Sequence, residues 1–150
     1  MPTYNLNING VNRTVTVADS TTPLLWVLRD MGLTGTKYGC GIEQCHACLV
    51  WLDGSPEEAC EESIAEVAAK RIVTIEGLSA TAAGRAIQQA FIDEQVPQCG
   101  FCQSGMLMRA AKIVQNRGVI PTGEDGLENI CACGTYPRVL KAITRAVNSL

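Results

Sequence analysis

Eight cysteines, arranged in two groups of four, constrain this chain more than any other feature of its sequence. The first group comprises Cys40, Cys45, Cys48 and Cys60, and the second comprises Cys99, Cys102, Cys131 and Cys133. Residues 61–98, between the groups, contain no cysteine. Such groups can form a disulfide framework, two zinc sites, or two iron–sulfur clusters with four thiolates each.

The disulfide interpretation is the weakest of the three. Disulfides are typical of short exported domains that cannot build a sufficient hydrophobic core. This chain has 150 residues, of which 47% are hydrophobic, so a core without covalent cross-links is expected. Residues 1–4 carry neither a basic region nor a hydrophobic stretch, and we expect no signal peptide.

The spacing of the first group favours an iron–sulfur cluster. Cys40, Cys45 and Cys48 follow the form C-x4-C-x2-C, and Cys60 supplies a fourth thiolate, as in a plant-type [2Fe–2S] site. The x4 gap allows a loop to wrap around a cluster and direct amide N–H groups at its sulfurs. Glycines flank Cys40 on both sides, where the backbone must approach inorganic sulfur closely.

Zinc is the remaining alternative from spacing alone. The pairs Cys45/Cys48 and Cys99/Cys102 each have the C-x2-C spacing of a zinc knuckle. A zinc site usually combines two such pairs, however, and has no use for an x4 element. His46 is the only histidine, which excludes a Rieske centre because that centre needs two.

The hydrophobic pattern changes near the middle of the chain. Up to residue 77 it has the period of two that is typical of strands, and the Asn9-Gly10 pair predicts a hairpin turn. The expected elements of this half are strands over residues 4–8, 11–17, 49–52 and 72–75, a helix begun by Thr22 as N-cap and Pro23, and a short helix with a capping box from Ser63 to Glu66.

From residue 78 onward the period is helical. The pattern predicts helices over residues 81–95, over residues 103–116 and from Pro137 to the end. Cys99 and Cys102 then lie between two helices, and Cys131 and Cys133 precede the last one. We therefore expect an α+β chain with two domains, 1–77 and 78–150, and one cysteine group centred in each.

Four segments of the sequence resemble a known family. They are Cys40–Cys48 (CGIEQCHAC), residues 72–78, Gln98–Gly105 (QCGFCQSG) and Cys131–Tyr136 (CACGTY). Together they are similar to the small iron–sulfur subunit of molybdenum hydroxylases, the xanthine oxidase and aldehyde oxidoreductase family. The short chain and the QSG segment resemble the small subunits of bacterial isoquinoline, nicotinate and aldehyde oxidoreductases.

The resemblance implies a fold and a set of site residues. The fold is an N-terminal plant-ferredoxin-like β-grasp followed by a C-terminal four-helix bundle. The first cysteine group would ligate an outer [2Fe–2S] cluster, and the second group would ligate an inner cluster nearer the molybdenum. Gln98 matches a glutamine that hydrogen-bonds the pterin in relatives, and Cys133 matches the ligand nearest that pterin.

The resemblance also implies a function and partners. The chain would pass single electrons from a molybdopterin cofactor, in its cytosine dinucleotide form, through both clusters to an external acceptor. A large partner subunit would hold that cofactor and oxidise an aldehyde or an N-heteroaromatic substrate. The acceptor would be a cytochrome, a flavin subunit or a quinone. The chain would have no catalytic residues of its own, and its sequence contains no recognisable triad, phosphate loop or nucleotide fingerprint.

Two residues depart from the family pattern, and one group of charges stands out. His46 and Ala132 occupy positions where relatives commonly have glycine and arginine, respectively. A side chain at residue 46 implies either a permissive backbone φ or a different loop. His46 could modulate the cluster potential or simply pack. The acidic residues around Cys60, which are Glu57, Glu58, Glu61 and Glu62, are either solvated charge or a docking site for a basic cytochrome.

Composition excludes some classes and leaves one rival. A net charge of −3 argues against nucleic-acid binding, and no apolar run is long enough to span a membrane. We expect a cytoplasmic protein, with export on a signal of the large subunit left open. The rival function is a free-standing diferredoxin-type electron carrier, and a remoter one is a zinc-binding interaction module.

Overall fold

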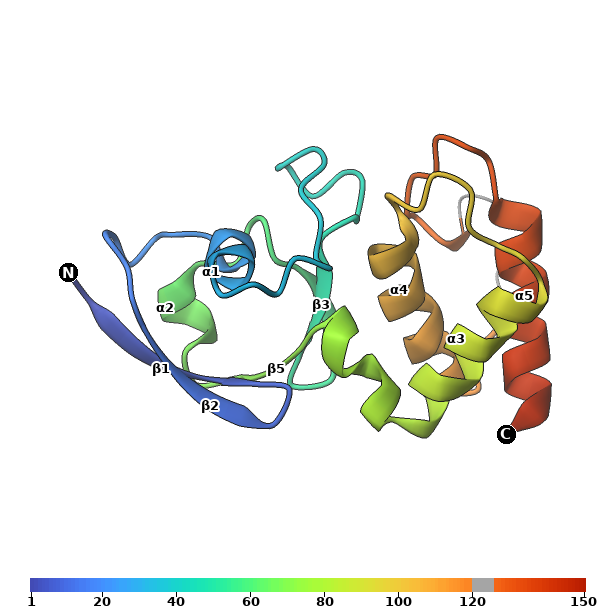
Figure 1. Ribbon diagram of the computed structural model, residues 1–150, viewed down its shortest axis with the longest axis horizontal. Helices are drawn as coiled ribbons and strands as arrows, with labels where there is room; N and C mark the ends of the chain where they lie inside the picture. Colours follow the sequence, from blue (N-terminus) through green and yellow to red (C-terminus); the bar gives the residue numbers. More distant parts are fainter. Residues whose placement is uncertain (120–125) are drawn as a thin grey trace.

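A computed structural model describes residues 1–119 and 126–150. A sheet half and a helical half lie end to end along the longest axis of the molecule (Figure 1). The elements, in chain order, are β1 (Thr3–Ile8), β2 (Val11–Thr16), α1 (Leu24–Asp30), β3 (Leu49–Leu52), β4 (Ser55–Glu58), α2 (Ile64–Val67), β5 (Arg71–Val73), the 3-10 helix η1 (Ile75–Ala80), α3 (Ala82–Asp93), α4 (Gln103–Gln115) and α5 (Tyr136–Ser149).

The strands form one mixed sheet in the order β2-β1-β5-β3-β4. All neighbours are antiparallel except β1 and β5. The predicted hairpin between β1 and β2 is confirmed, because Asn9 and Gly10 both have positive φ, at 53° and 80°. Helices α1 and α2 pack on this sheet around one buried cluster of leucine, isoleucine and valine side chains.

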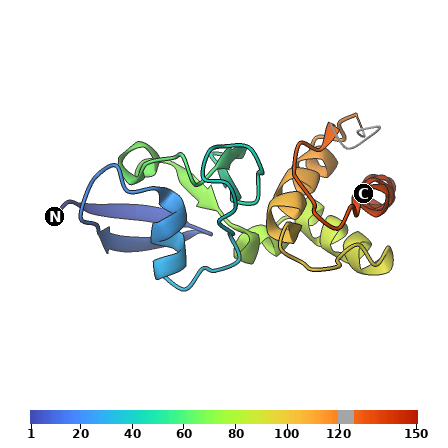
Figure 2. The same cartoon turned by 90° about the horizontal axis from the view of Figure 1, so that it is seen from above.

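Strand β3 belongs to two hydrophobic cores at once. Its four residues are all buried, and successive side chains point to opposite faces of a strand. Val50 and Leu52 pack in the core of the sheet half, whereas Leu49 and Trp51 pack in the core of the helical half. Trp51 Nε1 also donates a hydrogen bond of 3.0 Å to the carbonyl of Met108 in α4. In Figure 2, β3 and the loop before it lie between the two halves.

The helical half is built from α3, α4 and α5, which surround a second apolar core. Thr81 caps α3, with its hydroxyl accepting the amide of Gly84. The described residues of this half contain three α-helices, and η1 packs beside them. The predicted helices are confirmed, whereas a bundle of four helices stays a prediction.

Two local expectations were wrong, and one strand was not predicted. The predicted strand over 72–75 stops at Val73, because the Thr74 amide donates to the side chain of Asn9 and η1 begins at Ile75. Residues 55–58 form β4, which the polar sequence SPEE did not suggest. Pro23, not Thr22, occupies the N-cap position of α1.

The capping box of α2 was predicted and is present: the Ser63 and Glu66 side chains each accept the other's backbone amide. No helix among the described residues is long and apolar enough to cross a membrane.

Candidate metal centres

The loop before β3 directs backbone amides at the sulfur of Cys40. The amides of Ile42, Gln44 and Cys45 lie 3.4, 3.2 and 3.3 Å from Cys40 Sγ, and the Cys40 amide lies 3.3 Å from Cys45 Sγ. Successive amides that converge in this way form a cradle for a negative charge. Burial raises the pKa of the Cys40 thiol, and the three amides more than offset this, lowering the pKa to about 7.

Glycine is required at two positions of this loop. A Cβ on Gly39 would lie 2.6 Å from Cys45 Sγ, which is too close for any side chain. Gly41 has a φ of 70°, in the left-handed region that glycine adopts without strain. At Gly39 the backbone therefore comes close to the Cys45 sulfur, whereas at Gly41 the nearest atoms belong to the Tyr38 ring; the close approach to inorganic sulfur at both glycines stays a prediction.

The β3–β4 hairpin brings the other two cysteines of the first group together. Cys48 immediately precedes β3, Cys60 follows β4, and the Ala59 amide donates a 3.3 Å hydrogen bond to the Cys48 carbonyl. Burial raises the pKa of the Cys48 thiol to about 12, and the neighbouring Cys60 and Cys45 thiols contribute to the rise. Cys48 would therefore become a thiolate at neutral pH only with a cation to compensate its charge.

The second group gathers at helix ends, as the sequence predicts. Cys102 immediately precedes α4, and Cys131 and Cys133 precede α5. Cys102 and Cys131 are buried, and Cys99 and Cys133 are exposed. Burial, with the adjoining Cys131 thiol, raises the pKa of Cys102 to about 12.

Cys131 receives polar contacts from the start of α5. The hydroxyl of Thr135 lies 3.2 Å from Cys131 Sγ, and the Thr135 amide donates to the same sulfur at 3.5 Å. Burial raises the pKa of Cys131, but these contacts outweigh it and lower the pKa to about 7. The beginning of α5 thus stabilises a negative sulfur, as helix N-termini do.

The thiols adjoin one another in pairs. Each of the pairs Cys40/Cys45, Cys48/Cys60 and Cys102/Cys131 lies close enough for one thiol to shift the pKa of the other. Within residues 1–119 and 126–150, no three His, Cys, Asp or Glu side chains are grouped as a site for one metal ion.

An apolar cavity connects the two cysteine groups. It has a volume of about 200 Å³ and is lined by Gly39, Cys45, Ala47, Cys99, Phe101, Cys102, Ile130 and Ala132. Beside it, the Ile130 amide donates a 3.1 Å hydrogen bond to the carbonyl of Cys45. Ile130, the residue before Cys131, is therefore hydrogen-bonded to Cys45 of the first group.

Asn129 strengthens the same junction, and no pattern in the sequence predicts its role. Its side-chain amide donates a 3.0 Å hydrogen bond to the carbonyl of His46, and Arg109 donates to its oxygen. The His46 ring turns the other way, with Nδ1 at 2.6 Å from Glu58 Oε1. His46 has a φ of 57°, so the permissive backbone expected for a side chain at this position is present.

The two residues predicted to face a pterin lie at the surface. Gln98 and Cys133 are both exposed. In the chain, Gln98 directly precedes Cys99, and Cys133 follows Cys131 by two residues. The loops that carry them lie at the same end of the helical half (Figure 1). Ala132 lines the apolar cavity between the groups, where an arginine would bring a charge.

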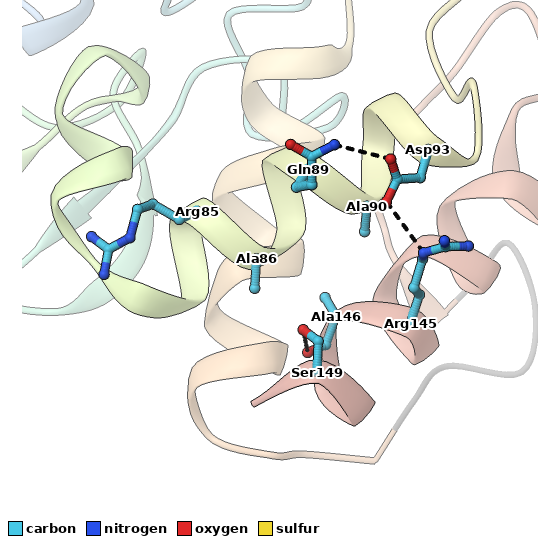
Figure 3. A pocket seen from close by; sticks show the side chains of 8 residues that line it. All are labelled: Arg85, Ala86, Gln89, Ala90, Asp93, Arg145, Ala146 and Ser149. Atoms are coloured by element: carbon cyan, nitrogen blue, oxygen red, sulfur yellow. Dashed lines mark hydrogen bonds and ion pairs between the residues drawn. The ribbon is translucent and has the colours of Figure 1, made fainter.

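A second depression, of about 290 Å³, lies between α3 and α5 and has no cysteine in its lining (Figure 3). Its guanidinium groups are already paired. Arg145 lies 3.3 Å from Asp93 and 2.9 Å from Glu94, and Arg85 donates to the carbonyls of Ser79 and Ala80. We do not regard this depression as a metal or ligand site.

Comparison with known families assigns each half of the chain to an iron–sulfur domain. Residues 6–74 match a family described as a 2Fe-2S iron-sulfur cluster binding domain. Residues 74–144 match a second family, described as a [2Fe-2S] binding domain.

Whole-chain relatives share the same organisation. A nicotinate dehydrogenase subunit from Pseudomonas putida is 43% identical over 98% of this chain and 96% of its own length. An isoquinoline 1-oxidoreductase subunit from Brevundimonas diminuta is also 43% identical, over 93% of each chain. The crystal structure of quinoline 2-oxidoreductase from Pseudomonas putida 86 contains a chain that superposes with a TM-score of 0.84 at 32% identity, covering 99% of this chain and 94% of that one.

The sheet half is therefore ferredoxin-like, and the expected α+β class is confirmed. The chain belongs to the family of small [2Fe–2S] subunits of molybdenum hydroxylases, the xanthine oxidase and aldehyde oxidoreductase family, in which its role is electron transfer within an oxidoreductase.

Proposed function

We propose that the chain holds two [2Fe–2S] clusters and passes electrons singly from the inner to the outer one. Cys40, Cys45, Cys48 and Cys60 would ligate the outer cluster, and Cys99, Cys102, Cys131 and Cys133 would ligate the inner cluster. Two irons need two thiolates each, and the thiol pairs support that division. The amides around Cys40 and the start of α5 would stabilise the charge of reduced clusters.

One observation carries the serial arrangement. The Ile130 amide donates a hydrogen bond to the Cys45 carbonyl, and Ile130 directly precedes Cys131 in the chain. One residue and one hydrogen bond therefore connect the two proposed ligand sets. The apolar cavity lined by Cys45, Cys99 and Cys102 lies at the same junction. An electron that reaches the inner cluster would therefore have a short route to the outer one.

We further propose that the exposed Gln98 and Cys133 face a molybdopterin, in its cytosine dinucleotide form, held mainly by a large partner subunit. That cofactor would supply the two-electron oxidation of substrate. In this chain, the Gln98 amide would bind and orient the pterin, and Cys133 would bring the inner cluster to it. The relatives named for nicotinate and isoquinoline favour an N-heteroaromatic substrate over an aldehyde.

Four finer assignments accompany this proposal. The domains divide as 1–77 and 78–150, with the boundary inside η1, and the second domain forms a four-helix bundle. The outer cluster delivers its electrons to a cytochrome, a flavin subunit or a quinone. The complex works in the cytoplasm.

The direction of electron flow can be tested by magnetic coupling in the purified complex. Because spin coupling falls steeply with distance, the paramagnetic molybdenum signal should be split by the inner cluster only. Cys131→Ser should perturb the splitting. The matched variant Cys60→Ser should remove one [2Fe–2S] signal and leave the splitting intact. If Cys60→Ser abolished the splitting and Cys131→Ser did not, the inner and outer assignments would have to be exchanged.

Gln98 can be tested separately. Gln98→Ala should leave the iron content unchanged and weaken cofactor retention, since it removes a buried hydrogen bond worth roughly 1–2 kcal/mol in the complex. Gln115→Ala, at the exposed end of α4 far from Cys102, is the matched control and should not affect cofactor retention. Full molybdenum occupancy and unchanged reduction by substrate in Gln98→Ala would remove Gln98 from the site.

A further inference from the structure

Three large hydrophobic side chains are exposed beside the first cysteine group. Trp26 on α1 is 46% exposed, Tyr38 is 49% exposed, and Ile42 is 64% exposed. Scattered apolar side chains at a surface are ordinary, whereas apolar side chains that adjoin one another often mark an interaction site. We refer to Trp26, Tyr38 and Ile42 together as the aromatic patch.

The aromatic patch is continuous with the backbone around Cys40. The ring centroids of Trp26 and Tyr38 are 5.2 Å apart. The Tyr38 ring covers Gly41, since a Cβ there would lie 3.0 Å from the edge of that ring. Ile42 follows Gly41, and its amide donates to Cys40 Sγ. A partner seated on the patch would thus lie next to a proposed ligand of the outer cluster.

Carboxylates lie beside the aromatic patch. Glu43 follows Ile42, and residues 59–62 run beside α1, where the amides of Leu24 and Leu25 donate to the carbonyls of Glu62 and Ala59. Burial raises the pKa of Glu62, and the nearby carboxylates add to that rise. The acidic residues that form this rim are Glu43, Glu57, Glu61, Glu62 and Glu66.

The basic residues nearby do not cancel this charge. Lys70 lies 4.0 Å from Glu62 and pairs with one carboxylate. Lys37 Nζ donates to the carbonyl of Thr34, and Arg29 donates to the carbonyls of Thr34 and Thr36. Bonds to neutral carbonyls leave both side chains positively charged. With Lys70 they make three cations against the five carboxylates of the rim, so an excess of negative charge remains.

We infer that the aromatic patch and its acidic rim dock a positively charged one-electron carrier protein, which takes electrons from the outer cluster. The inference rests on the proposed function and names the class of its acceptor. One reduced [2Fe–2S] cluster would give one electron to one oxidised carrier, and no bond or proton would need to move. An apolar centre inside a charged rim is the usual anatomy of such an interface, and complementary charge raises the rate of encounter.

Charge and position favour this occupant over others. An uncharged quinone would gain nothing from the carboxylate rim. The large subunit is expected at Gln98 and Cys133, which belong to the helical half, whereas the aromatic patch belongs to the sheet half.

The first test measures binding in the intact, oxidised complex. The probe is oxidised cytochrome c, a strongly basic carrier, titrated calorimetrically at low ionic strength. Glu43→Lys combined with Glu61→Lys should weaken binding about tenfold, and added salt should weaken the wild-type complex in the same way. Asp30→Lys is the control: it makes the charge change of one of these two reversals at the exposed end of α1, beside Val15 and Val17, and should leave binding unchanged, whereas Glu61→Lys alone should weaken it.

The second test measures electron delivery. The complex is reduced with dithionite, freed of excess reductant and mixed with cytochrome c or with a small uncharged quinone. The double charge reversal, and separately Trp26→Ser, should slow reduction of cytochrome c about tenfold at low salt and leave quinone reduction unchanged. Because dithionite replaces substrate, a failure of electron entry from the large subunit would not affect this result.

Three outcomes would overturn the inference. The first is wild-type binding of cytochrome c by the double variant at low ionic strength. The second is an equal loss of quinone and cytochrome reduction, which would indicate damage to the cluster. The third is loss of the large subunit from the variant complexes, which would assign the patch to that interface.

Discussion

His46 connects three parts of the molecule through its ring and its backbone. Its ring binds Glu58, on β4, at 2.6 Å. Its carbonyl accepts the Asn129 side chain, and the same carbonyl adjoins Gly105 of α4. The positive φ of 57° directs the ring and the carbonyl to these different partners. His46 is therefore packed and hydrogen-bonded at a position directly after Cys45.

The electrostatic part of that role can be measured. His46→Gly should keep both clusters, because glycine accepts this φ, but it leaves the Glu58 carboxylate without its imidazole partner. An unpaired negative charge disfavours an added electron, so the outer cluster's potential should fall and the inner one should not change. Glu58→Gln should shift the outer potential the opposite way in the same EPR-monitored titration. Identical potentials in all three proteins would leave His46 with a packing role only.

At the scale of residues, the sequence predicted the functional residues that form a recognisable motif with a fixed spacing. The C-x4-C-x2-C spacing and the glycines around Cys40 specify a loop that must approach sulfur, and the structure has that loop. Asn129 could not be found in the same way. Its partner, His46, is distant in the chain, and the hydrogen bond exists only because the two halves pack together.

At the scale of elements, α4 docks directly on the backbone of the cluster loop. Gly105 allows this approach, because a Cβ there would overlap the carbonyl oxygen of His46 and would lie 3.0 Å from Ala47 Cα. The Trp51 indole reaches the same helix at the Met108 carbonyl. Helix α4 thus contacts two points, His46 and Trp51, of the chain segment that runs from the first cysteine group into β3.

Gly105→Ala should loosen this junction. The added methyl group meets the backbone of His46 and Ala47, which cannot rotate away as a side chain could, so the free energy of unfolding should fall by roughly 1–3 kcal/mol. Gly118→Ala is the matched control, since its Cβ would have no neighbour nearer than 3.7 Å. Thermal unfolding of the two variants tests this. Equal stability of Gly105→Ala and Gly118→Ala would mean that the contact at His46 is not tight in solution.

Elements with a regular hydrophobic period were predictable, and elements defined by pairing were not. Helices α3, α4 and α5 follow the 3.6-residue pattern closely. Strand β4 has the sequence SPEE, and it is a strand only because it pairs with the buried β3 beyond the Asp53-Gly54 turn. The end of β5 depends on Asn9, which bonds to both the amide and the hydroxyl of Thr74 across the sheet.

At the scale of the whole molecule, the chain consists of two halves that share one strand. Each half carries one cysteine group, and β3 supplies side chains to both cores. The two groups meet at the apolar cavity, at a hydrogen bond between backbone groups and at Asn129. This architecture would hold the two proposed clusters at a fixed separation, which a relay of single electrons requires.

The relay should have no hydroxylase activity by itself. The large subunit, not this chain, is proposed to bind the substrate and the molybdopterin. The purified, partner-free chain should therefore accept electrons from dithionite but give no product with nicotinate, isoquinoline or an aldehyde. Turnover of any of these by the isolated chain, in proportion to its concentration, would contradict the assignment.

Metal and sulfide analysis of the natively purified complex tests the central claim most directly. Two quartets of thiolates that each hold a [2Fe–2S] cluster predict about four iron atoms and about four acid-labile sulfides per chain, with two distinct EPR signals after reduction. About two zinc atoms per chain, with negligible iron and no labile sulfide, would contradict the claim and make the cysteines structural.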